Sequence, residues 1–77
     1  MPEAWTTTDY ERLFRDHPPT EPQAPRGEDL ESLATTLRRS TGAVRAQWDD
    51  ARSAVLNSQT AASTQLIGYL RWRGWLG

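Results

Sequence analysis

Apolar residues recur three or four positions apart in four segments, which is the spacing of one face of an α-helix. No segment shows the strict alternation of a β-strand. The predicted helices lie between residues 6 and 17, 28 and 38, 42 and 57, and 59 and 73. Their apolar positions are Tyr10, Leu13 and Phe14; Leu30, Leu33, Ala34 and Leu37; Val44, Trp48, Ala51 and Val55; and Leu66, Ile67, Tyr69, Leu70 and Trp72. The pattern predicts an all-α protein.

The start of the first helix carries two overlapping signals. Thr6 and Asp9 have the spacing of a capping box, in which each side chain binds the other's backbone N–H. Trp5 and Tyr10 then occupy the two positions of a hydrophobic staple. Thr8 offers a competing N-cap, so the sequence alone leaves two possible starts.

The remaining helix limits come from proline, glycine and hydroxyl residues. The first helix should end by His17, because prolines follow and the residue before a proline avoids the α region. The proline-rich stretch 18–27 has no apolar period and is predicted to be an extended surface connector. Candidate caps further on are Ser40 or Thr41 for the third helix, Ser58 for the fourth, and Gly74 at its C-terminus.

The second and third predicted helices have the arrangement of a helix-turn-helix. Only a few residues separate them, and the second helix of the pair is the longer one. Ala34 is small enough to sit where the two helices touch. Leu37 and Val44 fill the angle between them, and Trp48 extends that core. We therefore expect a three-helix core with an additional C-terminal helix.

Composition excludes several classes of protein. A chain of 77 residues forms one small domain, and without cysteine it has neither disulfides nor thiolate metal sites. The one histidine, His17, is interpreted as a helix-end residue and not a metal ligand. Asp49 and Asp50 are adjacent and point to different helix faces, with no histidine to join them. We expect no enzyme activity, no metal, no cofactor and no small-molecule substrate.

The chain also lacks the signals of export and membrane insertion. No apolar run is long enough to cross a bilayer, and no charged-then-apolar signal peptide begins it. We expect a cytoplasmic protein without membrane contact.

Two families share the central pattern. Residues 33–55 resemble the helix-turn-helix of sigma-factor region 4, whose second helix often opens with Gly-Ala-Val-Arg, as residues 42–45 do here. The N-terminal part favours a resemblance to Myb/SANT-type DNA-binding domains. Residues 5–9 read Trp-Thr-Thr-Thr-Asp and lead to Leu13, which reproduces that family's opening pattern.

The third helix adds to the Myb/SANT resemblance. Val44 and Trp48 stand four positions apart, as valine or isoleucine and tryptophan do in that family, and Leu30 takes the place of the family's middle tryptophan. The match covers about residues 5–55 and is interrupted by the proline-rich stretch. It implies a Myb- or homeodomain-like fold and a DNA-binding regulator or architectural factor.

The resemblance implies that helix 42–57 lies in the major groove of double-stranded DNA. The residues it places at the duplex are Arg38, Arg39, Ser40, Thr41, Gly42, Arg45, Ala46, Asp49 and Arg52, with Arg38, Arg39 and Arg52 positioned for phosphates. Ala46 departs from the asparagine common in the family and cannot make its contact with adenine.

Charge argues for a weak phosphate field. The formal net charge is −1, and five arginines between residues 26 and 56 are matched by five carboxylates. Arg45 and Asp49 have the spacing of an ordinary helix-surface ion pair. A helix-turn-helix that contacts protein instead of DNA is therefore the alternative.

The C-terminal segment, residues 58–77, is treated separately from the helix-turn-helix domain of residues 1–57. Its apolar residues are Leu66, Ile67, Tyr69, Leu70, Trp72, Trp75 and Leu76. Three alternatives fit them: a helix folded back over the core, a homodimer or partner-docking surface, or an interfacial membrane anchor around residues 71–75. The second alternative makes the protein a non-enzymatic interaction module.

Overall fold

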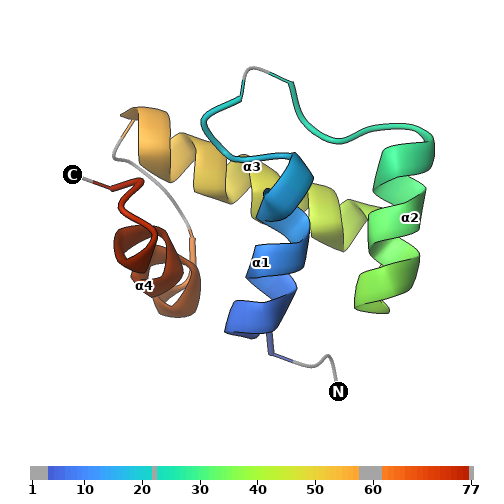
Figure 1. The fold of residues 1–77 in the computed structure, drawn as a ribbon, viewed down its shortest axis with the longest axis horizontal. Helices are drawn as coiled ribbons and strands as arrows, with labels where there is room; N and C mark the ends of the chain where they lie inside the picture. Colours follow the sequence, from blue (N-terminus) through green and yellow to red (C-terminus); the bar gives the residue numbers. More distant parts are fainter. Residues whose placement is uncertain (1–3, 22, 58–61, 77) are drawn as a thin grey trace.

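The computed structural model describes residues 4–21, 23–57 and 62–76. Its helices are α1 (Thr7–Asp16), α2 (Glu28–Leu37), α3 (Thr41–Asn57) and α4 (Thr64–Trp72). No strand is present in these ranges. α1 crosses α3, and both contact α2 and α4, which lie toward opposite ends of α3 (Figure 1). The prediction of an all-α protein is confirmed.

The predicted capping box starts α1. The Thr6 hydroxyl accepts a hydrogen bond from the Asp9 backbone N–H at 3.2 Å, and the Asp9 carboxylate accepts one from the Thr6 N–H at 3.0 Å. The staple is present as well, since the Trp5 ring stacks on Tyr10 with centroids 5.5 Å apart. The helix ends at Asp16, and His17 has left the helical conformation, as expected before two prolines.

α2 ends in a left-handed residue that turns the chain into α3. Arg38 has φ 56°, its N–H donates to the Thr35 carbonyl, and the next N–H donates to the Ala34 carbonyl. These two bonds form a Schellman motif, whose left-handed position is usually glycine. Ser40 then caps α3, because its hydroxyl accepts from the Ala43 N–H at 3.1 Å. Of the two caps considered, Ser40 is the one used.

One continuous core joins all four helices. Its buried side chains are Tyr10, Leu13, Phe14, Ala34, Leu37, Val44, Trp48, Ala51, Ala54, Leu66, Tyr69 and Leu70. Leu30 and Leu33, predicted as part of the buried stripe of α2, are only half-buried. On α3 the fourth buried position is Ala54, whereas Val55 is half-buried. Val55, predicted on the inward face, packs against the core without being fully buried.

The proline-rich connector differs from the prediction. Pro19 and Pro25 are fully buried, so the stretch packs on the core and is not a surface spacer. α3 also binds this part of the chain through its side chains. The Trp48 indole donates to the His17 carbonyl at 2.8 Å, and Arg52 donates to the Glu21 carbonyl at 2.6 Å. Proline rings are apolar, and this chain uses two of them as core residues.

α4 is shorter than predicted. It begins after Ser63, whose hydroxyl accepts from the Leu66 N–H at 3.2 Å. Residues 62 and 63 are not helical, and the predicted cap Ser58 lies outside the described residues. The predicted C-cap is confirmed: Gly74 has φ 79° and donates to the Arg71 carbonyl, and Trp75 donates to the Leu70 carbonyl.

α4 is held against α1 by an aromatic cluster, formed by the rings of Tyr10, Phe14, Tyr69 and Trp75. Tyr69 lies 5.3 Å from Tyr10 and 5.9 Å from Phe14, and Trp75 meets Phe14 edge-on at 5.7 Å, all between ring centroids. The described part of the C-terminal segment, residues 62–76, therefore folds back over the core, as the first of the three alternatives states. Within the described ranges, no helix has the length and apolar character needed to cross a membrane.

Candidate nucleic-acid interface

The residues that the resemblance implies for DNA contact lie at the α2–α3 turn and on α3. Most of the predicted set has exposed side chains: Arg38, Ser40, Thr41, Gly42, Arg45, Ala46 and Asp49. They lie around the corner where α2 ends and α3 begins, beside an open hollow lined in part by Glu31, Thr35 and Arg38. The opposite side of α3 carries Val44 and Trp48 into the core. The start of α3 is thus anchored on one side and exposed on the other.

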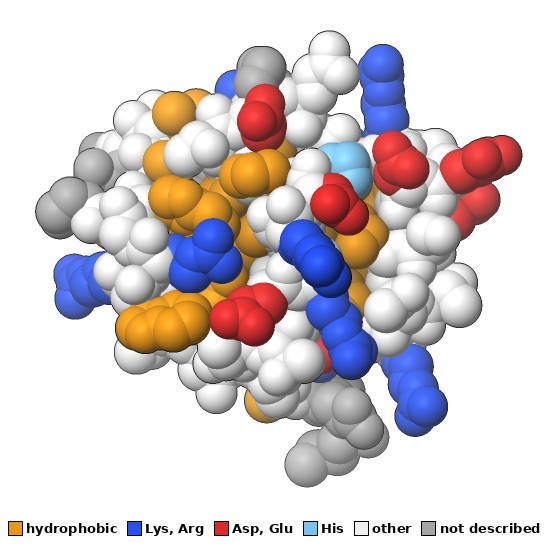
Figure 2. Space-filling view, viewed as in Figure 1, with side chains coloured by type: hydrophobic (Ala, Val, Ile, Leu, Met, Phe, Trp, Pro, Cys, Tyr) orange, Lys and Arg blue, Asp and Glu red, His pale blue; other side chains and the backbone are white. Residues whose placement is uncertain are grey.

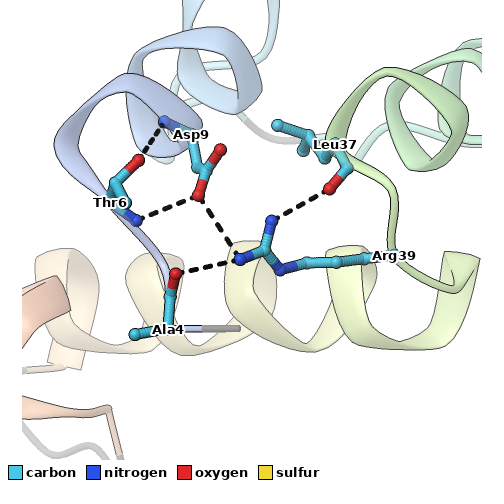
Figure 3. A network of polar contacts seen from close by, with 5 residues as sticks. All are labelled: Ala4, Thr6, Asp9, Leu37 and Arg39. Carbon is cyan, nitrogen blue, oxygen red and sulfur yellow. Dashed lines mark hydrogen bonds and ion pairs between the residues drawn. The ribbon is translucent and has the colours of Figure 1, made fainter. Parts of the chain in front are cut away.

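The Arg39 guanidinium is bound by other groups of the protein. Its Nη1 donates to the Leu37 carbonyl at 3.0 Å, and its Nη2 donates to the Ala4 carbonyl at 3.1 Å and lies 3.4 Å from the Asp9 carboxylate (Figure 3). The guanidinium also lies 4.3 Å from the centroid of the Trp5 ring. We call these contacts the Arg39 tie. They connect the segment before α1 to the α2–α3 turn.

Arg45 and Arg52, the two predicted arginines that lie on α3, also have protein partners. Arg45 forms the expected ion pair with Asp49, at 3.1 Å between Nε and Oδ1, with both side chains about half exposed. Arg52 donates to the Glu21 carbonyl and lies 5.6 Å from the centroid of the Trp48 ring. The ion pair between Arg45 and Asp49 is weak, because both side chains are exposed to solvent. Arg52 and Arg39 also serve the fold.

The predicted partner-docking residues divide into three groups. Leu66, Tyr69 and Leu70 are buried by this chain's own helices. Ile67, Trp75 and Leu76 are half-buried against the core. Trp72 is the exception: its ring is 67% exposed. Only part of the predicted apolar set is therefore available to another molecule.

Sequence reasoning missed two groups of charged residues. The Arg39 tie joins residues more than thirty positions apart, and no local spacing indicates such a contact. Arg12, Arg15 and Arg73 line one open hollow with Thr8 and Glu11, between α1 and the end of α4. The spacing of Arg12 and Arg15 places them on one side of α1, which the sequence does indicate. Their approach to Arg73 depends on how α4 packs.

Two buried tyrosines, Tyr10 and Tyr69, have raised pKa values. Burial raises the pKa of the Tyr10 phenol above its ordinary value, and burial does the same for Tyr69. The Tyr69 hydroxyl accepts a hydrogen bond from Arg73 at 3.1 Å, which partly offsets the rise in pKa. Both phenols remain neutral at physiological pH.

No family model, curated protein sequence or solved structure matches this chain. The function is therefore argued from the residues and their geometry.

Proposed function

We propose that the protein binds double-stranded DNA through a helix-turn-helix formed by α2 and α3, with the first half of α3 in the major groove. The observation that carries the proposal is the exposed start of α3, opposite a side fixed in the core by Val44 and Trp48. Gly42 and Ala46 are small, and they permit close approach to base edges and thymine methyl groups.

The arginines take separate parts in this proposal. Arg45 reaches bases or phosphates by exchanging its contact with Asp49, and Arg38 contacts a phosphate beside the turn. Arg39 supports the turn from inside through the Arg39 tie. Helix N-termini also carry backbone N–H groups that bind phosphate oxygens. Contacts to two or three phosphates give a salt slope of roughly −2 to −3 in log K against log salt concentration.

Fluorescence anisotropy tests the proposal directly. A labelled mixed-sequence duplex is titrated with the protein at low salt and then at stepwise higher salt. We expect a dissociation constant on the order of 10⁻⁵ M at low salt, weakening steeply as salt rises.

Two arginine variants locate the contact. Arg45→Ala should weaken duplex binding about ten-fold. Arg12→Ala, on a different helix, is the matched control and should leave it unchanged. Absence of duplex binding even at low salt would falsify the proposal, and equal losses in the two variants would place the contact elsewhere on the molecule.

A further inference from the structure

A second surface, formed by α1 and α4, carries features that the fold does not require. Apolar side chains reach the surface here, and arginine side chains flank them (Figure 2). The most prominent is Trp72, 67% exposed, beside an open hollow lined in part by Trp5, Gly68 and Tyr69. We call this surface the α1/α4 face. Tryptophan is one of the residue types enriched where binding energy is concentrated at protein interfaces.

Gly68 is the second unexplained feature. It lies inside α4, where glycine is about 1 kcal/mol less favourable than alanine. Its φ is not positive, and a Cβ atom built at this position meets nothing within 4 Å. The fold therefore gains nothing from glycine here. The absence of a side chain leaves the hollow open beside Trp72, one helical turn further on.

Charge is the third feature. Arg12, Arg15 and Arg73 line the adjoining hollow with Glu11 as its one carboxylate. Tyr69 connects the two hollows: its ring lies 5.9 Å from that of Trp72, and its hydroxyl binds Arg73. The guanidinium of Arg73 is held further by the Trp75 ring, at 4.7 Å from its centroid. Three arginines and one glutamate line this hollow, although the chain as a whole has a net charge of −1.

We propose that the α1/α4 face binds an acidic amphipathic helix of a partner protein. An apolar side chain of that helix packs beside Trp72 and over Gly68, and its carboxylates pair with Arg12, Arg15 and Arg73. Tryptophan and arginine are the residues that most often dominate binding energy at protein interfaces. The glycine leaves room for a helix to lay its apolar face into the hollow, which is the helix-in-groove mode of recognition.

Two other occupants fit the face less well. A nucleic acid would place phosphates next to Glu11 and would leave the apolar hollow beside Gly68 unused. The densest acidic group that a second copy of this chain could offer, Glu28, Asp29 and Glu31, lies on α2 and outside the α1/α4 face. A contact between that group and the arginines is not self-complementary, and such contacts continue into open assemblies unless they close a ring.

The test uses the full chain and two synthetic helical peptides with identical leucine positions. One peptide carries glutamate at all its polar positions, and the other carries lysine. Titration calorimetry should detect the glutamate peptide, with at least ten-fold weaker binding of the lysine peptide. Trp72→Ala should weaken binding of the glutamate peptide at least ten-fold. Leu56→Ala is the matched control, since Leu56 is the other exposed large apolar residue of the described chain, and it should change nothing.

Gly68→Gln separates a docking role from a structural one. Glutamine favours the helix, so the variant should raise Tm by about 4 °C, while binding of the glutamate peptide falls at least ten-fold. Equal binding of both peptides, failure to bind the glutamate peptide at about 1 mM, or an equal loss in Leu56→Ala would overturn the proposal. So would self-association that Trp72→Ala abolishes, or single-stranded DNA that binds in place of the peptide. Duplex binding through α3 is independent of these outcomes, because Trp72→Ala leaves α3 intact.

Discussion

The two ends of α3 are held in place by different chemistry. At its start, aliphatic side chains of Leu37 and Val44 fill the corner with α2, and the Arg39 tie connects that corner to the segment before α1. Toward its other end, α4 is fastened by the aromatic cluster together with Leu66 and Leu70. The first region relies on one charged side chain, whereas the second spreads its contacts over many rings.

The difference shows how a chain without cysteine stabilises a small domain. Aromatic rings bury a large area per residue, so four of them close a helix pair without any covalent link. The corner between α2 and α3 is filled by aliphatic side chains, and a forked guanidinium supplies directional bonds there. Substitutions in the cluster should therefore cost packing energy, and substitution of Arg39 should remove several polar contacts together.

The largest effect is expected from Leu70→Ala. Leu70 is fully buried in the core, and such truncations cost about 2–5 kcal/mol. A domain of this size has a total stability of only about 5–15 kcal/mol. Urea denaturation followed by circular dichroism measures the loss. Leu37→Ala in the corner is the matched variant and should cost a similar amount.

Hydrogen exchange then tests whether the two regions unfold together. Because one continuous core joins all four helices, Leu70→Ala should reduce amide protection in α2 as well as in α4. Loss of protection confined to α4 would mean that the region around α4 unfolds independently of the α2–α3 corner.

Arg39→Ala should have the next largest effect. The Arg39 side chain is 12% exposed, and its removal leaves the Asp9 carboxylate and two carbonyl groups without these bonds. Hydrogen bonds to charged groups contribute about 1.5–3 kcal/mol, so we expect a loss of about 2–3 kcal/mol in the free energy of unfolding. Thermal denaturation measures it.

Two controls define the role of the Arg39 tie. Arg39→Lys keeps the charge and loses the fork, so it should recover only part of the stability. Arg12→Ala, at an exposed position, should change the free energy of unfolding by less than about 0.5 kcal/mol. If Arg39→Ala also changed the free energy of unfolding by less than this amount, the aliphatic contacts alone would stabilise the corner.

Local patterns predicted much of this fold. The capping box at Thr6, the end of α1 before His17 and the Gly74 cap all depend on residues close in sequence, and each was confirmed. The buried face of α1 followed from spacing alone. The break between α2 and α3 was also placed correctly, because hydroxyl and glycine residues mark it.

Features set by tertiary packing were not predictable in this way. Burial of Pro19 and Pro25 depends on tertiary packing, which no proline spacing reveals. The Arg39 tie and the arrangement of Arg12 with Arg73 likewise join distant segments. The docking residues predicted on α4 formed one apolar set in the sequence. Packing against α1 then buried Leu66, Tyr69 and Leu70 and left the Trp72 ring exposed.

A smaller, stabilising effect is expected at the turn. Arg38 has φ 56°, a conformation that costs an ordinary residue about 1–2 kcal/mol relative to the right-handed region. Arg38→Gly should stabilise the protein by about 0.5–1 kcal/mol, since glycine also loses more chain entropy on folding. Thermal denaturation should show a higher Tm. Arg71→Gly, in the last turn of α4, is the contrasting variant and should destabilise by up to about 1 kcal/mol. A lower Tm for Arg38→Gly would contradict the Schellman geometry.

The two tyrosines of the aromatic cluster should make the free energy of unfolding depend on pH in alkaline solution and not at neutral pH. Burial raises the pKa of Tyr10 and of Tyr69 above the ordinary value of 10.0, so above pH 10 the unfolded chain binds fewer protons than the folded one. Stability is therefore complete below pH 10 and falls as the pH rises through the raised values. Denaturation at several pH values between about 9 and 11 measures that slope. Tyr10→Phe should make the fall shallower, and the double variant with Tyr69→Phe should lose most of it. If the double variant kept the same slope, titration of groups outside the cluster would be responsible, and the phenols would have no part in the alkaline limit of the fold.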